Sequence, residues 1–384
     1  MKSRQKMASY LVTVGLVMSF CFALAGQAAA TTDPSNTLQG YGIKIFRVES
    51  GLYPFVQIYL RSFDQNMNPL VNLNERNLGL MVTGRGYDPG KGQYRIHSIR
   101  NRNEMIRTVI VLDTSATMKG VPFETALNAA ARFINNKRSQ DQVAIVALSD
   151  NENGFELVSN FERDPGVLGR RLADLHANGM KTRLYDGIAY AMQLAAGAGA
   201  GGTSSSDADY VASTSIVVFS DGKDEGSAIS RTDLMTRITN IKTPVPIYSL
   251  AYTKIKPEYL KNMQALSKNS FGKYYHIDQA YGEMTRSVED IQYILQNDYV
   301  ITFRAYLPID GEEHLLKVGI EYPSGSGKLR YETTSFETME PPVFPKIMEA
   351  QKQLDQYLPM LPDANPYLSN PFTSELLKVK GAEN

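Results

Sequence analysis

Five oxygen-bearing side chains in three separate segments of the chain have the chemistry to bind a cation. An apolar run ends in Asp113, Ser115 and Thr117, which place one carboxylate and two hydroxyls at alternate positions. The second segment contains Thr182, and the third contains Asp221. Mg²⁺ prefers hard oxygen ligands and keeps several waters, which leaves a position open for a partner. The sequence therefore predicts a Mg²⁺ site, with Mn²⁺ as the alternative because it also prefers oxygen.

The elements that must position these side chains alternate between strand and helix. Continuous apolar runs predict buried strands at 108–112, 143–148, 216–219, 247–251 and 273–277, and an antiparallel edge strand at 155–161. Apolar residues at helical spacing predict helices at 123–134, 165–175, 184–195, 259–266 and 284–295. Asp164 followed by Pro165 predicts a capped start for the second of these helices. This pattern is typical of an α/β fold, with a doubly wound, mostly parallel sheet covered on both faces.

The position of the two carboxylates agrees with this fold class. Asp113 and Asp221 each end a predicted strand. In an open α/β sheet, ligands bind at the carboxyl ends of the strands. We therefore expect the five side chains to meet at one edge of the sheet. If they only capped helices and satisfied loop backbone, no ion would be needed.

The flanks of this region have a different pattern. Short strands are predicted at 56–60 and 78–82 before it, and at 299–305, 316–320 and 329–336 after it. We infer that residues 31–104 and 298–340 pair into one antiparallel, β-sandwich-like domain with residues 105–297 inserted between them. Two separate β modules are the alternative.

Three further segments are interpreted from composition. Residues 341–384 are expected to form a tail, helical at 346–358 and then extended because of Pro362, Pro366 and Pro371. The low-complexity segment Gly197–Asp209 is expected to be a flexible surface insertion. Gly86–Gly92 is interpreted as a hairpin turn.

The start of the chain is typical of a secretory signal. Residues 1–30 have a basic start, an apolar run from Tyr10 to Ala25 and a small-residue end at Ala28-Ala29-Ala30. The apolar run is shorter than the roughly 20 residues that span a bilayer, so we expect cleavage after Ala30 and export to the periplasm or the cell surface. Membrane attachment is expected only if the segment stays uncleaved. Cys21 is the only cysteine, so the mature chain is expected to have no disulfide.

Composition and motifs exclude several classes of function. Lys+Arg and Asp+Glu are equal at 40 each, so a nucleic-acid partner is not expected. The four histidines His97, His176, His276 and His314 are scattered through unrelated elements, and no G-x-S-x-G or H-E-x-x-H motif occurs. The sequence therefore does not predict an enzyme.

The inserted region resembles a von Willebrand factor A (VWA) domain. Asp113-Thr114-Ser115-Ala116-Thr117 resembles the DxSxS metal loop of that family, with Thr in place of the last Ser. Thr182 with Leu184-Tyr185-Asp186 resembles its threonine loop, and Ser220-Asp221-Gly222 resembles its distal aspartate loop. The match of three loops in order is specific and covers about half of the chain. The flanking strands resemble, more loosely, the β segments around this domain in exported bacterial proteins.

The resemblance implies a metal-ion-dependent adhesion site. By analogy with that family, Ser115 and Thr117 of this chain would bind the ion directly, whereas Thr182, Asp113 and Asp221 would bind it directly or through water. A Glu or Asp of a partner protein would fill the remaining position. The implied function is an exported adhesion or assembly module. A structural scaffold and, less favoured, a Mg²⁺-dependent enzyme are the alternatives. Because helix 284–295 leads directly into the strand at Tyr299, a displacement of this helix on ligand binding is predicted to be passed to the β domain.

Overall fold

The computed structural model describes residues 40–197, 211–242, 244–252, 256–278 and 282–361. The predicted signal segment 1–30, nearly all of the predicted insertion 197–209 and the predicted extended tail lie outside the described residues. Within the described ranges, no helix is both long and apolar enough to cross a membrane.

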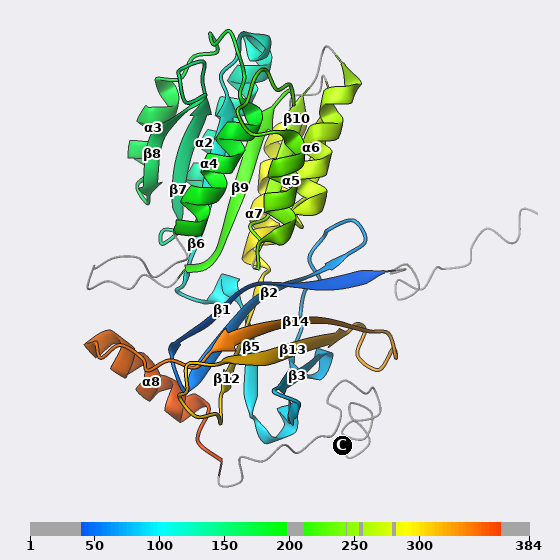
Figure 1. Cartoon of the computed structure of the whole chain (residues 1–384), viewed down its shortest axis with the longest axis vertical. Coiled ribbons are helices and arrows are strands. Elements are labelled where there is room, and N and C mark those ends of the chain that lie inside the picture. The colour runs from blue at the N-terminus through cyan, green and yellow to red at the C-terminus, as the bar shows by residue number, and fades with distance from the viewer. Residues whose placement is uncertain (1–39, 198–210, 243, 253–255, 279–281, 362–384) are drawn as a thin grey trace, which may run out of the picture. The chain divides into compact units, whose positions relative to one another are not determined.

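The middle of the chain forms an α/β unit. Its strands are β6 (Met105–Asp113), β7 (Gln142–Leu148), β8 (Phe155–Glu162), β9 (Val211–Ser220), β10 (Ile247–Tyr252) and β11 (Tyr274–Ile277). Its helices are α2 (Val121–Asn136), α3 (Pro165–Ala173), α4 (Leu184–Gly197), α5 (Arg231–Asn240), α6 (Pro257–Asn269) and α7 (Gly282–Gln296). The strands form one six-stranded sheet in the order β11-β10-β9-β6-β7-β8, and only β8 at its edge runs antiparallel (Figure 1). The predicted fold class is confirmed.

Helices cover both faces of this sheet because its strands are apolar on both sides. In β6, Ile110 and Leu112 pack into a core with α2, α3 and α7. The alternate residues Val109 and Val111 pack into a second core with α4, α5 and α6. Successive side chains of a strand point to opposite faces, so an uninterrupted apolar run is what a two-sided core requires.

The flanks form two antiparallel sheets. Sheet A contains β1 (Tyr41–Leu52), β2 (Phe55–Asp64), β5 (Tyr94–Ser98) and β12 (Tyr299–Arg304), in the order β1-β2-β12-β5. Sheet B contains β3 (Leu78–Val82), β4 (Arg85–Tyr87), β13 (Glu313–Glu321) and β14 (Leu329–Glu337), in the order β14-β13-β3-β4. Phe303 of sheet A packs edge-to-face against Tyr87 and Phe336 of sheet B. Each sheet thus combines strands from before and after the α/β unit, and their faces pack together.

The chain enters and leaves the α/β unit at neighbouring strands of sheet A. The chain leaves sheet A after β5, passes through the α/β unit and returns to sheet A at β12. Strands β5 and β12 pair antiparallel, with Ser98 opposite Tyr299. The backbone N–H of Ile99 donates to the carbonyl of Asp298 at 2.9 Å. The insertion therefore leaves sheet A continuous, since both ends of the inserted unit start from adjacent positions.

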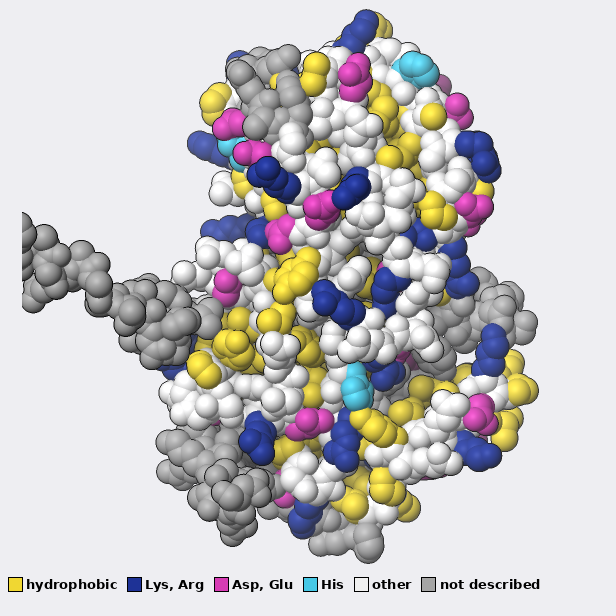
Figure 2. Space-filling model, turned by 180° about the vertical axis from the view of Figure 1, so that it is seen from behind, with side chains coloured by type: hydrophobic (Ala, Val, Ile, Leu, Met, Phe, Trp, Pro, Cys, Tyr) yellow, Lys and Arg dark blue, Asp and Glu magenta, His cyan; other side chains and the backbone are white. Residues whose placement is uncertain are grey.

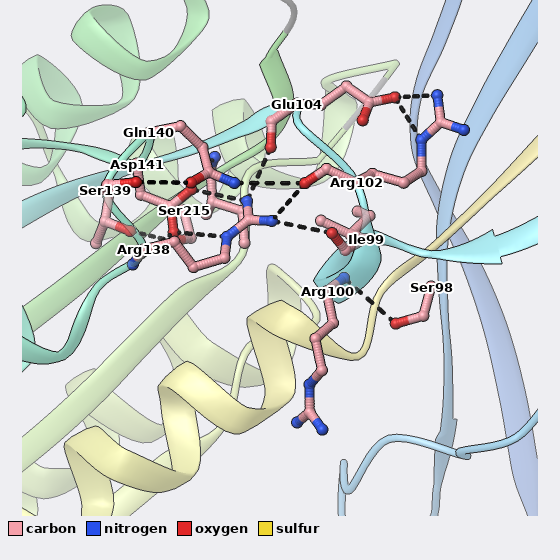
Figure 3. A network of polar contacts seen from close by, with 12 residues as sticks. Ser98, Ile99, Arg100, Arg102, Glu104, Arg138, Ser139, Gln140, Asp141 and Ser215 are labelled. Carbon is pink, nitrogen blue, oxygen red and sulfur yellow. Dashed lines mark hydrogen bonds and ion pairs between the residues drawn. The ribbon is translucent and has the colours of Figure 1, made fainter.

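Arg138, just after α2, fixes the segment that enters the α/β unit. Its guanidinium donates to the carbonyl oxygens of Ile99, Arg102 and Glu104 at 2.9, 3.2 and 2.8 Å (Figure 3). It also donates to the Asp141 carboxylate at 2.7 Å. One planar group thus satisfies three carbonyls of an irregular segment, which would otherwise need water or other donors.

A buried ion pair joins sheet A to the α/β unit at the exit. Arg61 of β2 donates to both oxygens of Asp298, at 2.6 and 2.8 Å, and also to the Tyr248 hydroxyl of β10. The side chains of Arg61 and Asp298 are each 1% exposed. Asp298 lies between α7 and β12, so this pair links three elements that are distant in the sequence.

Three predictions about individual segments were wrong or incomplete. Helix α5 was not predicted, because only Leu234 and Ile238 of its residues are buried. The segment Gly86–Gly92 is not a hairpin turn, since β4 pairs in sheet B whereas the next strand, β5, pairs in sheet A. Strands β1, β4 and β5 were also not predicted.

The last described helix is packed and not part of a loose tail. Helix α8 (Pro345–Tyr357) lies where the sequence predicts it. Its Ile347 and the following Leu358 are buried against Leu52 and Phe55 of sheet A. Arg304 of β12 donates to the carbonyl oxygen of Leu358 at 3.2 Å. The helix therefore belongs to the β domain.

Candidate functional site

The first predicted metal loop begins where β6 ends. Asp113 is the last residue of the strand and is 1% exposed. Its carboxylate accepts the backbone N–H of Ser115 at 2.9 Å and the hydroxyl of Ser220 at 2.7 Å. The hydroxyl oxygens of Ser115 and Thr117 lie 2.9 Å apart. One carboxylate and two hydroxyls therefore gather at the carboxyl end of a central strand, with Ser115 buried and Thr117 exposed.

The second predicted loop is bonded to the first by its backbone. Ala116 donates its N–H to the carbonyl of Gly179 at 2.7 Å, and Gly179 donates its N–H to the carbonyl of Thr114 at 3.0 Å. A Cβ at Gly179 would lie 3.3 Å from that same carbonyl oxygen, so the approach is close. Thr182 follows in this loop, is 1% exposed and immediately precedes Arg183 and α4.

The third predicted loop follows β9 and contacts the second. Asp221 is 5% exposed and accepts the N–H of Lys223 at 3.0 Å. Glu225 donates its N–H to the carbonyl of Thr182 at 2.6 Å. Gly222 has φ +79° and no room for a side chain, because a Cβ there would lie 2.5 Å from the carbonyl oxygen of Tyr259. The turn after Asp221 therefore requires glycine.

The electrostatics of the site are unfavourable without a cation. Burial and the nearby Asp221 carboxylate raise the pKa of Asp113 to about 6, although hydrogen bonds from Ser115 and Ser220 oppose this shift. Two buried carboxylates that repel each other are costly unless a positive charge compensates them. The donor set, two carboxylates with hydroxyls, fits a hard divalent cation such as Mg²⁺.

The structure thus relates the five predicted residues in two ways. Asp113, Ser115 and Thr117 meet through side-chain contacts, and the charge of Asp221 acts directly on Asp113. Thr182 is brought to them by the backbone bonds of its loop. The binding of an ion, its identity and the ligand roles stay predictions. No group of three or more His, Cys, Asp and Glu side chains that could hold a metal occurs in the described ranges.

Ser220 is a site residue that the sequence analysis did not select. It is fully buried, donates to Asp113 and accepts the N–H of Gly222 at 3.0 Å. It therefore holds the carboxylate of one loop and the turn of another. Its position directly before Asp221, at the end of an apolar strand, was the available signal.

A cavity of about 780 Å³ lies elsewhere in the chain. It is bordered by the segment entering the α/β unit, by sheet A and by α8, and its lining includes Gln57, His97, Arg102 and Tyr357. The ring of His97 and the hydroxyl of Tyr357 lie 2.6 Å apart, which joins β5 to the end of α8. None of the five predicted metal ligands lines this cavity.

Fold and site together define an α/β domain with a candidate cation site at the carboxyl ends of its strands. Residues 108–223 match the family profile of the von Willebrand factor type A domain. The chain therefore contains a VWA domain, as the resemblance predicted. No match is found among the curated proteins.

Several solved structures are similar to this chain. A von Willebrand factor type A protein from Catenulispora acidiphila is 11% identical, with 82% of this chain and 78% of that chain covered and a TM-score of 0.43. The ArnB paralog VWA2 from Sulfolobus acidocaldarius is 14% identical, with 83% of this chain and 81% of that chain covered and a TM-score of 0.38. The SpRpn10 VWA domain is 18% identical, with 47% of this chain and 93% of that chain covered and a TM-score of 0.36. At these identities and TM-scores, the similarities do not bear on function.

Proposed function

We propose that this protein captures an acidic side chain of a partner protein through a Mg²⁺ ion. Asp113, Ser115, Thr117, Thr182 and Asp221 would hold the ion, with Mn²⁺ as the alternative metal. We further propose that the chain acts after export, in the periplasm or at the cell surface, and that it binds its partner without catalysing a reaction.

The strongest support for this proposal is that two buried carboxylates, Asp113 and Asp221, lie close enough for Asp221 to raise the pKa of Asp113, beside the exposed hydroxyl of Thr117. Asp113 and Asp221 are 1% and 5% exposed, whereas Thr117 next to them is exposed. A purely structural pair of carboxylates would be expected to have cationic partners or full solvation. An ion that is held from below by buried oxygens remains open to a ligand from solvent.

The proposal gives distinct roles to the hydroxyl and carboxylate side chains of the site. Ser115 and Thr117 offer their hydroxyl oxygens from one short turn. Asp113 and Asp221 supply the negative charge, and Ser220 fixes the orientation of Asp113 through its 2.7 Å hydrogen bond. When bound, Mg²⁺ would supply Lewis acidity for one added carboxylate.

Family and surface both support a protein partner. VWA domains are generally protein-interaction or adhesion modules. On the face that Figure 2 shows, basic and acidic side chains are interspersed without a large field of one sign. A nucleic-acid partner would favour a basic stripe.

The site is tested by titrating Mg²⁺ into the Asp113→Asn chain. Asn keeps an acceptor for the N–H of Ser115 but removes the charge, so we expect the fold to persist and Mg²⁺ affinity to fall by at least about tenfold. Asp113→Ala should abolish Mg²⁺-dependent binding as well. Isothermal titration calorimetry measures the ion affinity.

Asp164→Asn is the matched control. Asp164 is exposed and caps α3 by accepting the N–H groups of Gly166 and Val167, and Asn caps a helix as well as Asp does. Unchanged Mg²⁺ affinity in the Asp113→Asn chain would contradict the site. If a partner is recovered equally with and without EDTA, the scaffold alternative is favoured. Turnover in a hydrolase panel with added Mg²⁺ would favour the enzyme.

A further inference from the structure

The loop that contains Thr182 exposes an apolar side chain beside the candidate metal site. Met180 is 82% exposed, more than any other large apolar side chain of the described residues. It lies two positions before Thr182 and directly after Gly179. Leaving a methionine side chain in water is unfavourable, and burying it in an interface recovers that free energy.

The backbone at Met180 is fixed on both sides. Gly179 exchanges hydrogen bonds with Thr114 and Ala116, as described above. The N–H of Met180 itself donates to the Asp150 carboxylate at 3.1 Å. The side chain is therefore presented from a defined position relative to Ser115, and little backbone freedom needs to be lost when a partner binds.

Four of the five predicted ligands are recessed, whereas Thr117 and several nearby residues form an exposed rim. Asp113, Ser115 and Thr182 are 1%, 3% and 1% exposed. The fifth predicted ligand, Thr117, is exposed, and so are the nearby residues Ala116, Lys119, Met180 and Lys181. A partner whose carboxylate reaches the ion must therefore approach this rim, which offers one large apolar side chain, Met180, and two cationic ones, Lys119 and Lys181.

We propose that Met180 is a specificity-determining residue for the partner. It packs against an apolar side chain that lies within a few residues of the partner's Asp or Glu, while Lys119 and Lys181 favour an acidic surrounding. The partner segment is thus an exposed loop or terminus of mixed acidic and apolar character. This inference rests on the proposed metal-dependent binding.

Selection from a displayed peptide library tests the inference. The library has a fixed central Asp and random flanks, and peptides are selected on the full chain in Mg²⁺ and eluted with EDTA. For the native chain we expect Leu, Ile, Val, Met or Phe to be enriched within three positions of the Asp. A selected peptide should bind the Met180→Gln chain about 10- to 100-fold more weakly, as expected when a buried methionine contact is lost.

Met360→Gln is the matched control, because Met360 is 72% exposed and follows α8. It should leave peptide selection and affinity unchanged. Mg²⁺ titration of each variant separates loss of the ion from loss of the rim contact. Weaker Mg²⁺ binding in the Met180→Gln chain would place Met180 at the ion and overturn the inference.

Two outcomes distinguish this inference from the function on which it rests. If EDTA-eluted peptides show no apolar preference, or the same preference on the Met180→Gln chain, the role of Met180 is overturned and metal-dependent capture stands. If no peptide is eluted by EDTA, metal-dependent capture fails and the role of Met180 fails with it.

Discussion

Asp113 carries a carboxyl group that is costly to ionise in the folded protein. It is buried in a site where its nearest charged influence is another carboxylate. Its hydrogen bonds from Ser115 and Ser220 stabilise the ionised form, but burial and repulsion outweigh them, because the net shift of its pKa is upward. A residue selected for stability alone would not need this charge.

The raised pKa of Asp113 predicts how the Mg²⁺-free chain responds to pH. The pKa rises from 3.8 to about 6 on folding, so the folded state holds the proton more tightly than the unfolded state. The free energy of unfolding should therefore fall as pH increases through this interval, by roughly 3 kcal/mol in total. Chemical denaturation at several pH values without divalent cations measures the effect.

The Asp113→Asn chain provides the comparison, since it has no proton to lose at this position. Its free energy of unfolding should lack this component, whereas Asp164→Asn should retain it. Added Mg²⁺ should restore stability at neutral pH in the native chain, because a ligand of the folded state stabilises it. Parallel pH profiles for the native and Asp113→Asn chains would contradict the argument.

The residues of the site differ in how well the sequence could predict them. Asp113 ends β6 and Asp221 directly follows β9. Parallel strands place their carboxyl ends at one edge of the sheet, so the proximity of the two residues follows from the pattern. Ser220 was not selected although it directly precedes Asp221, because the sequence does not show that its hydroxyl donates to Asp113. Exposure of Met180 could not be predicted, since it depends on the bonds between Gly179 and the first loop.

At the scale of elements, predictability follows the amount of buried surface. Strand β6 contains the unbroken apolar run 109–112 and was predicted at 108–112, whereas α5 buries only Leu234 and Ile238 and was missed. The start of β9 at Val211 was also missed because its first residues, Ala212 to Ser215, are small or polar. Ser213, Thr214 and Ser215 nevertheless pair with β6. Pairing with a neighbouring strand therefore sets the start of β9 where the local sequence pattern is too weak to do so.

Helix α8 offers a prediction about how it is attached. Ile347 is 5% exposed and packs with Leu52 and Phe55, so Ile347→Ala should lower the free energy of unfolding by about 2–4 kcal/mol. Met348 is the adjacent residue and is 57% exposed, so Met348→Ala should change it by less than about 0.5 kcal/mol. Urea denaturation measures both variants. Equal effects would show that α8 is not docked in solution.

At the scale of the whole molecule, the insertion depends on the adjacency of β5 and β12. The sequence indicates strands on both sides of the α/β unit but cannot tell whether they pair. Pairing requires the exit and entry points to meet, and Ser98 opposite Tyr299 satisfies this requirement. The buried contact of Arg61 with Asp298 could not be predicted, because the two residues are far apart in the chain and neither has a local signal.

The Arg61–Asp298 pair should couple the β domain to the VWA domain. Arg61→Met leaves the fully buried Asp298 without its cation, so we expect a loss of about 3–5 kcal/mol in the free energy of unfolding. Replacing both residues by apolar ones should recover much of this loss. Arg132→Met is the control, because the Arg132–Glu289 pair on α2 and α7 is exposed and should contribute less than about 1 kcal/mol.

The same pair bears on the predicted displacement of α7. Asp298 follows the helix by two residues, so a shift of α7 along its axis would pull the carboxylate away from Arg61 and leave both charges buried. We therefore expect the last turn of α7 to be protected from hydrogen exchange in the native chain, with and without Mg²⁺, and to become Mg²⁺-sensitive in the Arg61→Met chain. Faster hydrogen exchange of this turn in the native chain when Mg²⁺ binds would contradict this expectation. It would show that the Arg61–Asp298 pair does not hold α7 in place and that displacement of α7 reaches sheet A.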